Sequence, residues 1–310
     1  MADVVDLLAL CRVRDPELSW HFIAREAQRP GGLERLLAGN ASERSAQAET
    51  TLGILHASAA TFEDRREWAA EVIESARADG YRLTTVLDDD YPVNLRLVHN
   101  LPPFLFYLGE LRPDDAYSVA VVGTRQPSEA GLLRAQKLSR RLAGAGVTVL
   151  SGLARGIDTA AHEECVAAGG RTIAVLGSGI RRIYPDENGD LARRIADQGA
   201  IVSQFWPDTG PIHYNFPRRN VVTSGMGQGT VVIEATRTSG AKMQARLAFE
   251  HGKLVFLLRS LVTSQPWTRR FLGQPRVYEV DNVDDIVRWL RTPDEQRDRA
   301  QQRERLALAL

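Results

Sequence analysis

The sequence predicts an α/β protein with a Rossmann-like, doubly wound and mainly parallel sheet behind a small N-terminal helical domain. From residue 118 onward, short apolar runs alternate with longer segments of helical spacing. Continuous apolar runs are typical of parallel strands buried on both faces, and their alternation with helices indicates a doubly wound sheet. The glycine turns fall at the ends of these runs, and such sheets bind their ligands at the carboxyl ends of the strands.

Residues 1–80 form the predicted helical domain. Apolar residues such as Leu33 and Leu36 recur at helical spacing, and Pro30-Gly31-Gly32 breaks the pattern. Residues 41–62 give no clear pattern. We expect this domain to serve protein contacts and to carry no chemistry.

The predicted Rossmann-like domain covers residues 81–290. It opens with a strand at 82–87 and a second strand at 104–109, directly after Pro102-Pro103. Because proline cannot donate a hydrogen bond to a neighbouring strand, we predict that the second strand lies at an edge of the sheet.

The core of this domain is a series of buried strands, each followed by a helix except where the chain turns back. The predicted strands are 119–122, 147–150, 173–176, 200–203, 230–233, 254–257 and 277–280. The predicted helices are 128–142 with Ser128 as N-cap, 188–198, 239–250 and 283–290. Residues 291–310 are charged and glutamine-rich, and we expect a frayed surface helix there.

Two glycine loops form the predicted binding site. The first is Gly123-Thr124-Arg125, and the second contains Ser151, Gly152, Arg155 and Gly156. A small-residue loop that opens a helix gathers free N–H groups at a positive helix end, which favours phosphate. Arg125 and Arg155 add guanidinium groups, each of which can donate two hydrogen bonds to one phosphate. The alternative is that both loops are ordinary connections of a doubly wound sheet.

A third element of the site is the segment Phe216-Pro217-Arg218-Arg219-Asn220, with Tyr214 nearby. Two arginines beside an aromatic ring suit a single nucleic-acid strand, because charge follows the phosphates while the ring stacks on a base. Phe216 is equally well explained as a core anchor. The arginines are harder to explain in that way, and Lys242 adds a further positive charge.

Asp158 and His162 lie four residues apart on one predicted helix face. A carboxylate in the first turn stabilises the helix and would repel a phosphate, so we interpret Asp158 as structural. We expect a structural contact between Asp158 and His162 rather than catalysis.

The segments VAVVGTR, SGLARGIDTAAH, TIAVLGSGIRRIYPDEN and FPRRN, in this order, resemble the DprA/Smf family of DNA-processing proteins. The resemblance covers roughly residues 81–290. It implies an extended Rossmann-like core that binds single-stranded DNA and helps to load RecA onto it. It also implies that the turn at Arg125 contacts phosphate. Many members carry a C-terminal winged-helix domain, for which this chain leaves no room.

The chain departs from the family pattern at three places. Gln204 stands where the family usually has Glu, and Val221 replaces an arginine that would contact phosphate. Leu258-Arg259 stands where Pro-Gly is usual. Val221 and Leu258-Arg259 support a further alternative, a divergent paralogue that retains the fold but has lost DNA binding.

Glu234 suggests an alternative function as a nucleotide sensor or enzyme. It follows a predicted strand and precedes Ser239-Gly240, a place where a carboxylate can bind ribose or act as a base. Gly227-Gln228-Gly229-Thr230 with Glu234 loosely resembles the catalytic stretch of phosphoribohydrolases. The leading glycine pair is absent and the Glu comes one residue late.

Composition limits the remaining possibilities. The formal net charge is zero, but residues 63–90 hold nine acidic and four basic side chains, and residues 210–246 hold five basic and one acidic. Such asymmetry fits one polyanion-binding side. Cys11 and Cys165 lack metal-ligand spacing, and no signal peptide or membrane span is recognisable. We therefore predict a cytoplasmic protein without cofactor or metal. The resemblance implies a homodimer whose partners are single-stranded DNA and RecA.

Overall fold

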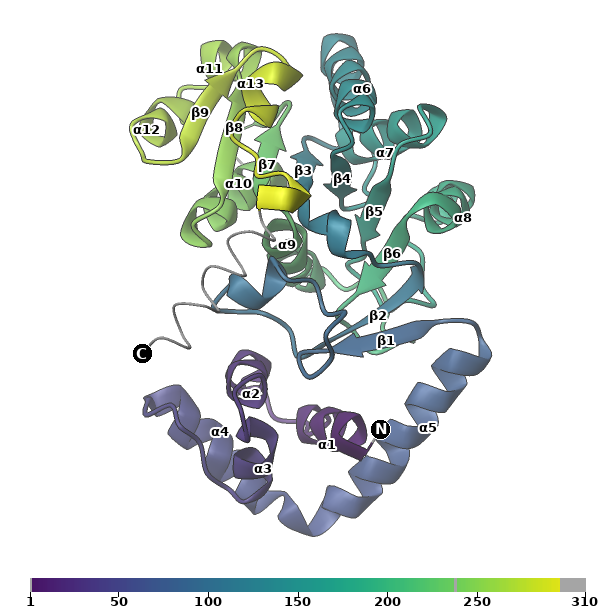
Figure 1. The fold of residues 1–310 in the computed structure, drawn as a ribbon, viewed down its shortest axis with the longest axis vertical. Coiled ribbons are helices and arrows are strands. Elements are labelled where there is room, and N and C mark those ends of the chain that lie inside the picture. Colours follow the sequence, from purple (N-terminus) through teal and green to yellow (C-terminus); the bar gives the residue numbers. More distant parts are fainter. Residues whose placement is uncertain (1, 237–238, 296–310) are drawn as a thin grey trace.

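The computed structural model describes residues 2–236 and 239–295, and it contains one sheet of nine strands with helices on both faces (Figure 1). The strand order is β1-β2-β6-β5-β4-β3-β7-β8-β9. The pairs β1–β2 and β2–β6 are antiparallel, and the other neighbours are parallel. The predicted fold class is therefore confirmed. The predicted domain boundaries at residues 80 and 290 stay a prediction, and most of the predicted tail, 296–310, lies outside the described residues.

The strands lie close to their predicted places because each apolar run is short and bounded by turn residues. They are β1 (Arg82–Thr85), β2 (Phe104–Gly109), β3 (Ser118–Val122), β4 (Thr148–Ser151), β5 (Thr172–Val175), β6 (Ala200–Ser203), β7 (Gly229–Val232), β8 (Leu254–Leu258) and β9 (Val277–Val280).

Five α-helices precede the sheet, and eight lie within or after it. The first five are α1 (Ala2–Cys11), α2 (Trp20–Ala27), α3 (Gly32–Leu37), α4 (Ala46–Ala57) and α5 (Phe62–Ala78). The others are α6 (Glu129–Gly144), α7 (Ile157–Ala167), α8 (Gly189–Gln198), α9 (Asn215–Met226), α10 (Gly240–Glu250), α11 (Arg259–Ser264), α12 (Thr268–Leu272) and α13 (Val283–Val287). None of the described helices combines the length and apolarity that crossing a membrane requires.

The prediction that the strand after Pro102-Pro103 lies at an edge is wrong. β2 lies inside the sheet between β1 and β6. Its first paired residue, Phe104, faces Thr85, so both prolines precede the antiparallel ladder. The carbonyl of Pro103 still accepts a hydrogen bond from Val86. The missing N–H groups therefore cost no ladder bond.

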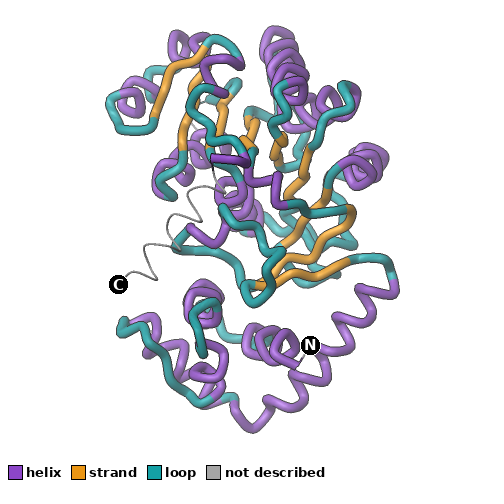
Figure 2. The backbone as a smooth tube through the Cα atoms, in the orientation of Figure 1, coloured by secondary structure: helices purple, strands orange, loops and turns teal. Residues whose placement is uncertain are grey.

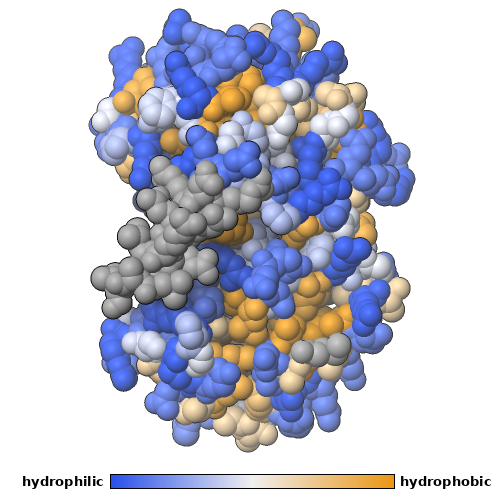
Figure 3. All heavy atoms as spheres, in the orientation of Figure 1, coloured by the Kyte–Doolittle hydropathy of each residue, from blue (hydrophilic) through white to orange (hydrophobic). Residues whose placement is uncertain are grey.

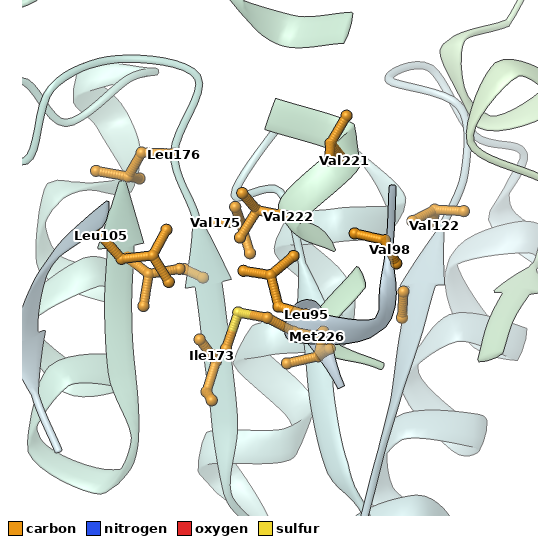
Figure 4. Close-up of a cluster of buried hydrophobic side chains, with 14 of the residues drawn as sticks. Leu95, Val98, Leu105, Val122, Ile173, Val175, Leu176, Val221, Val222 and Met226 are labelled. Atoms are coloured by element: carbon orange, nitrogen blue, oxygen red, sulfur yellow. The ribbon is translucent and has the colours of Figure 1, made fainter. Parts of the chain in front are cut away.

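Helices α6, α7 and α8 cover one face of the sheet, and α9 and α10 cover the other (Figures 1 and 2). The segment before β2 also contributes to the core. In Figure 4, its Leu95 and Val98 lie beside Val222 and Met226 of α9. This packing fixes α9, whose first turn forms part of the site described below.

The N-terminal helices are joined to the sheet by a cluster of large aromatic rings. Trp206, just after β6, stacks on Phe104 of β2 with ring centroids 4.6 Å apart. The Trp206 ring also makes edge contacts with Trp20 of α2 and Trp68 of α5, with ring centroids 5.4 and 4.9 Å apart. The helical part and the sheet consequently share one hydrophobic core.

Candidate nucleic-acid interface

A cavity of about 470 Å³ opens at the carboxyl ends of β3 and β4. The loops after these strands form one side, and the first turns of α9 and α10 form the other. The predicted site residues that line it are Gly123, Thr124, Arg125, Gly152, Phe216, Arg219, Asn220, Ser239 and Gly240. The structure thus brings together residues that are more than a hundred positions apart in the chain.

The two glycine loops touch each other at Gly156. This residue has φ +81°, and a Cβ built on it would lie 2.5 Å from the carbonyl oxygen of Thr124. Only glycine allows this close approach in this backbone conformation. The amides of Arg125 and Gly156 donate no hydrogen bond to any described residue, which leaves them for an acceptor from outside.

The second loop is held in shape by two polar side chains. Asp158 accepts a hydrogen bond from the amide of Gly152 at 3.2 Å. Asn188 donates from Nδ2 to the carbonyl of Leu153, which has φ 57°. Left-handed backbone is costly for leucine, so this anchor helps to retain it. Burial raises the pKa of Asp158, while the charge of Arg219 and hydrogen bonds from Ser151, Ala154 and Gly152 oppose that shift.

The expected contact between Asp158 and His162 is wrong. Asp158 turns back to the loop amide, as a residue in the first helical turn can. His162 instead hydrogen-bonds through Nδ1 to Thr172 Oγ1 at 2.8 Å, on β5. Burial lowers the pKa of His162 to about 3, so the ring is neutral and structural.

Arg125 and two aromatic rings form the mouth of the cavity. The exposed guanidinium of Arg125 lies 5.2 Å from the centre of the Phe216 ring. The ring of Tyr184, which is 39% exposed, lies 5.9 Å from that of Phe216. Tyr184, Arg125, Phe216 and Arg155 also line a small adjoining cavity. Tyr184 was not predicted as a site residue, although it lies in the motif GIRRIYPDEN.

The half-buried position of Phe216 agrees with a role as a core anchor, while its contact with a base stays a prediction. Gly177, after β5, leaves room for the ring, because a Cβ there would lie 2.6 Å from Phe216 Cδ1. One face of the ring is therefore packed against the protein, and the other lies under Arg125. A base could reach only the outer edge of this pair.

Arg219 is a core residue. The expectation that the arginines of residues 216–220 are hard to explain as core residues is therefore wrong for Arg219. It is 7% exposed and donates from one nitrogen to the carbonyls of Gly152 and Val175, at 2.5 and 2.7 Å. Burial lowers its pKa, and the negative charge of Asp158 opposes that shift. Arg219 supports the floor of the cavity and lends it positive potential.

Three other predicted cations point elsewhere. Arg218 lies over Trp20 and Phe205, both at 5.8 Å. Lys242 lies over Trp267 at 5.6 Å. Arg155 forms an exposed ion pair with Glu187 at 2.6 Å. Exposed pairs are weak, so Arg155 can exchange Glu187 for phosphate.

Ser151 and Glu234 have structural partners. Ser151 Oγ donates to the carbonyl of Val121 at 2.7 Å and ties β4 to β3. The carboxylate of Glu234 accepts from Ser128 N at 3.0 Å and from Ser128 Oγ at 2.6 Å. Ser128 in turn caps α6, as predicted. Both carboxylate oxygens of Glu234 therefore accept a hydrogen bond at the start of α6. A negative charge at this end stabilises a helix.

Among the described residues there is no group of three or more His, Cys, Asp or Glu side chains that could hold a metal ion. Cys11 and Cys165 are both buried and free. The cavity is lined by backbone amides, arginine and an aromatic ring, and also by the side chains of Asp158 and His213.

The comparison with protein families identifies the fold and its relatives. Residues 82–287 match the family model of DNA recombination-mediator protein A. The chain belongs to this family. The match includes both glycine loops and α9, so the cavity is built from residues within the family region.

Several relatives carry the names DprA or Smf. The chain is 43% identical to protein Smf of Escherichia coli over 169 residues, which cover 54% of this chain and 45% of that protein. It is 38% identical to protein Smf of Synechocystis over 192 residues, 61% of this chain and 48% of that protein. It is 37% identical to DNA processing protein DprA of Streptococcus pneumoniae, over 56% of this chain and 61% of that protein. The chain thus spans between about half and three fifths of these curated relatives.

Two solved structures resemble this fold over different shares of the chain. DNA processing protein A from Streptococcus pneumoniae superposes with a TM-score of 0.73 and 25% identity, covering 93% of this chain and 98% of that one. DNA processing protein A from Helicobacter pylori, described for its single-stranded DNA binding mode, gives a TM-score of 0.59 and 26% identity. It covers 67% of this chain and 94% of that one.

Proposed function

We propose that this protein binds single-stranded DNA at the carboxyl ends of β3 and β4, protects it, and passes it to RecA during transformation and recombination. The observation that carries the proposal is the mouth of the cavity, where an exposed arginine lies over a half-buried phenylalanine beside an exposed tyrosine. Charge and aromatic rings at one point suit a flexible strand with accessible bases. The family membership and the named relatives support the same substrate.

Within this proposal each group has a task. Arg125 and the amides of the two loops bind phosphate, Tyr184 and the edge of Phe216 contact a base, and Arg219 supplies positive potential from below. Arg155 also binds phosphate when its ion pair with Glu187 breaks. A homodimer, the transfer to RecA and a cytoplasmic location belong to the proposal as predictions that follow from the family resemblance.

The alternative of a nucleotide sensor or hydrolase receives no support from the position of Glu234. Its carboxylate is held by Ser128 at the start of α6. We therefore propose no reaction at this residue.

The test is fluorescence anisotropy with labelled oligonucleotides of several sequences at two salt concentrations. We expect Arg125→Ala to weaken binding to all sequences by a similar factor, because a phosphate contact carries no sequence information. The log–log salt slope should become shallower by about 0.7. Arg194→Ala, which removes an exposed charge from α8, is the matched control and should bind as the parent protein does. Unchanged affinity and slope in Arg125→Ala would show that the strand binds elsewhere.

A further inference from the structure

A second cavity, of about 410 Å³, lies on the same edge of the sheet between α6 and the ends of β8 and β9. Its cationic lining consists of Arg134, Lys137, Arg140, Arg141 and Arg259, against one carboxylate, Asp281. Its floor includes the buried side chains of Leu138 and Leu258. Nothing in the proposed function uses this place.

The basic residues of α6 form one stripe along the helix. Arg134, Lys137 and Arg141 are three or four positions apart, so their side chains project from the same side. Arg134 and Lys137 form no ion pair with any described residue. Arg141 pairs with Asp284 at 3.2 Å, and both side chains are exposed. Such a pair contributes little and can be exchanged.

The opposite wall carries one further cation. Arg259, at the start of α11, pairs with Glu279 and Asp281, each at 2.7 Å. Its side chain is 64% exposed, so these contacts leave part of the guanidinium open to solvent. Figure 3 shows a small apolar area framed by hydrophilic residues near the top of the molecule, where Figure 1 draws α6 and α13.

The two cavities are neighbours along the sheet edge. The first lies at the ends of β4 and β3, and the second begins at β8, which only β7 separates from β3. Adjacent strands are about 4.8 Å apart, so β3 and β8 are about 10 Å apart. Helix α6 also connects the sites, because Ser128 at its start follows the Arg125 loop and its later turns line the second cavity.

We propose that the α6 groove is a second binding segment for the same single strand, which runs from the Arg125 cavity along the basic stripe of α6. This inference rests on the proposed function. The stripe binds successive phosphates, and the apolar floor receives the edge of an unpaired base. A duplex would fit less well, because its bases are stacked inside and cannot reach that floor.

The test compares oligothymidylates of about 6 and about 20 nucleotides, lengths that span the usual site size of one single-strand binding fold. The variant is Arg134→Gln/Lys137→Gln, which removes the two cations without an ion pair. Its matched control is Arg193→Gln/Arg194→Gln, a double charge removal on α8. Binding is measured by anisotropy between about 50 and about 200 mM salt.

We expect the α6 variant to bind the short oligonucleotide as the parent does and the long one more weakly. Loss of two phosphate contacts should make the salt slope for the long strand shallower by about 1.4. Between about 50 and about 200 mM salt, the affinity of the variant for the long strand should therefore fall about sevenfold less than that of the parent. The α8 control should leave both oligonucleotides unaffected.

The outcomes separate the two proposals. If the long strand shows the same affinity and slope in the α6 variant as in the parent, the second segment is wrong while the first site stands. An equal loss in the α8 control would also overturn it, because the effect would then reflect net charge. If the parent protein binds neither oligonucleotide, both proposals fail and the groove is left for an acidic segment of another protein.

Discussion

Arg219 carries a positive charge inside the protein, directly below the cavity. Its hydrogen bonds go to the carbonyls of Gly152 and Val175, at the ends of β4 and β5. A Cβ on Gly152 would lie 1.9 Å from Nη1 of Arg219, so the loop and the arginine occupy adjoining space. The charge of Arg219 is opposed by the buried Asp158. A residue predicted to bind DNA thus also holds two strand ends together.

Arg219→Met should lower the free energy of unfolding by about 3 kcal/mol, because two buried carbonyls lose a charged donor and Asp158 loses its compensating charge. Asp158→Asn removes the second charge. In the double variant, the loss should be smaller than the sum of the single losses by about 1 kcal/mol, as expected for coupled neighbours. Urea unfolding of the four proteins measures this. Strictly additive losses would mean that the two charges are not coupled.

At the residue scale, the sequence predicted local contacts better than distant ones. Ser128 and Ser239 are the N-caps of α6 and α10, because a cap depends on the two or three residues that follow it. The partner of Glu234 is Ser128, 106 positions away, and no local pattern shows it. The burial of Arg219 was missed for the same reason, since its acceptors lie on two other strands.

At the scale of elements, the site depends on how closely the two glycine loops approach. Gly156 has φ +81°, and its Cβ position is blocked by the carbonyl of Thr124. Gly169, after α7, has φ +68°, and no atom lies within 4 Å of its Cβ position. The two glycines therefore share a positive φ, but the ψ of −124° at Gly156 lies outside the left-handed helical region, and their surroundings differ.

Gly156→Ala and Gly169→Ala form a matched pair. Gly169→Ala should lose about 1–2 kcal/mol of stability from the positive φ in a residue with Cβ. Gly156→Ala should lose more and should also bind single-stranded DNA more weakly, since the added methyl separates the loops and moves Arg125. Thermal unfolding and anisotropy check both effects. Equal affinities in the two variants would indicate that the spacing of the loops does not matter for binding.

The strands themselves were predictable, whereas their order was only partly so. Short apolar runs, several of them followed by glycine, placed β3 to β8 within a residue or two. The neighbours of β2 could not be derived from Pro102-Pro103, because prolines before the first paired residue exclude nothing. Pairing between β2 and β6 joins segments that are almost a hundred residues apart, and no local sequence pattern predicts it.

At the scale of the whole molecule, Trp206 joins the helical part to the sheet. It contacts Phe104 of β2, Trp20 of α2 and Trp68 of α5. Arg181, after β5, forms an ion pair across the same boundary with Asp79, and a second one with Asp208 on its own side. One aromatic side chain thus contacts two N-terminal helices and one strand, and Trp20 also contacts Phe104 directly, with ring centroids 5.2 Å apart.

Trp206→Ala should therefore reduce the free energy of unfolding by about 3 kcal/mol, the lower end of the usual cost for a core aromatic side chain, because Trp206 is only partly buried. Trp289→Ala is the matched control, because Trp289 is 44% exposed and stacks on Tyr278 at the far end of the sheet. The control should lose much less stability.

In Trp206→Ala the chain between α5 and β1 should also become accessible to protease before the sheet unfolds, because the helical part loses a large anchoring side chain. Binding of a short oligonucleotide should persist, since residues 122–244 alone line the first cavity. Equal stability and equal protease resistance in the two tryptophan variants would show that the helical part is held by other contacts, with the ion pairs of Arg181 the next to remove.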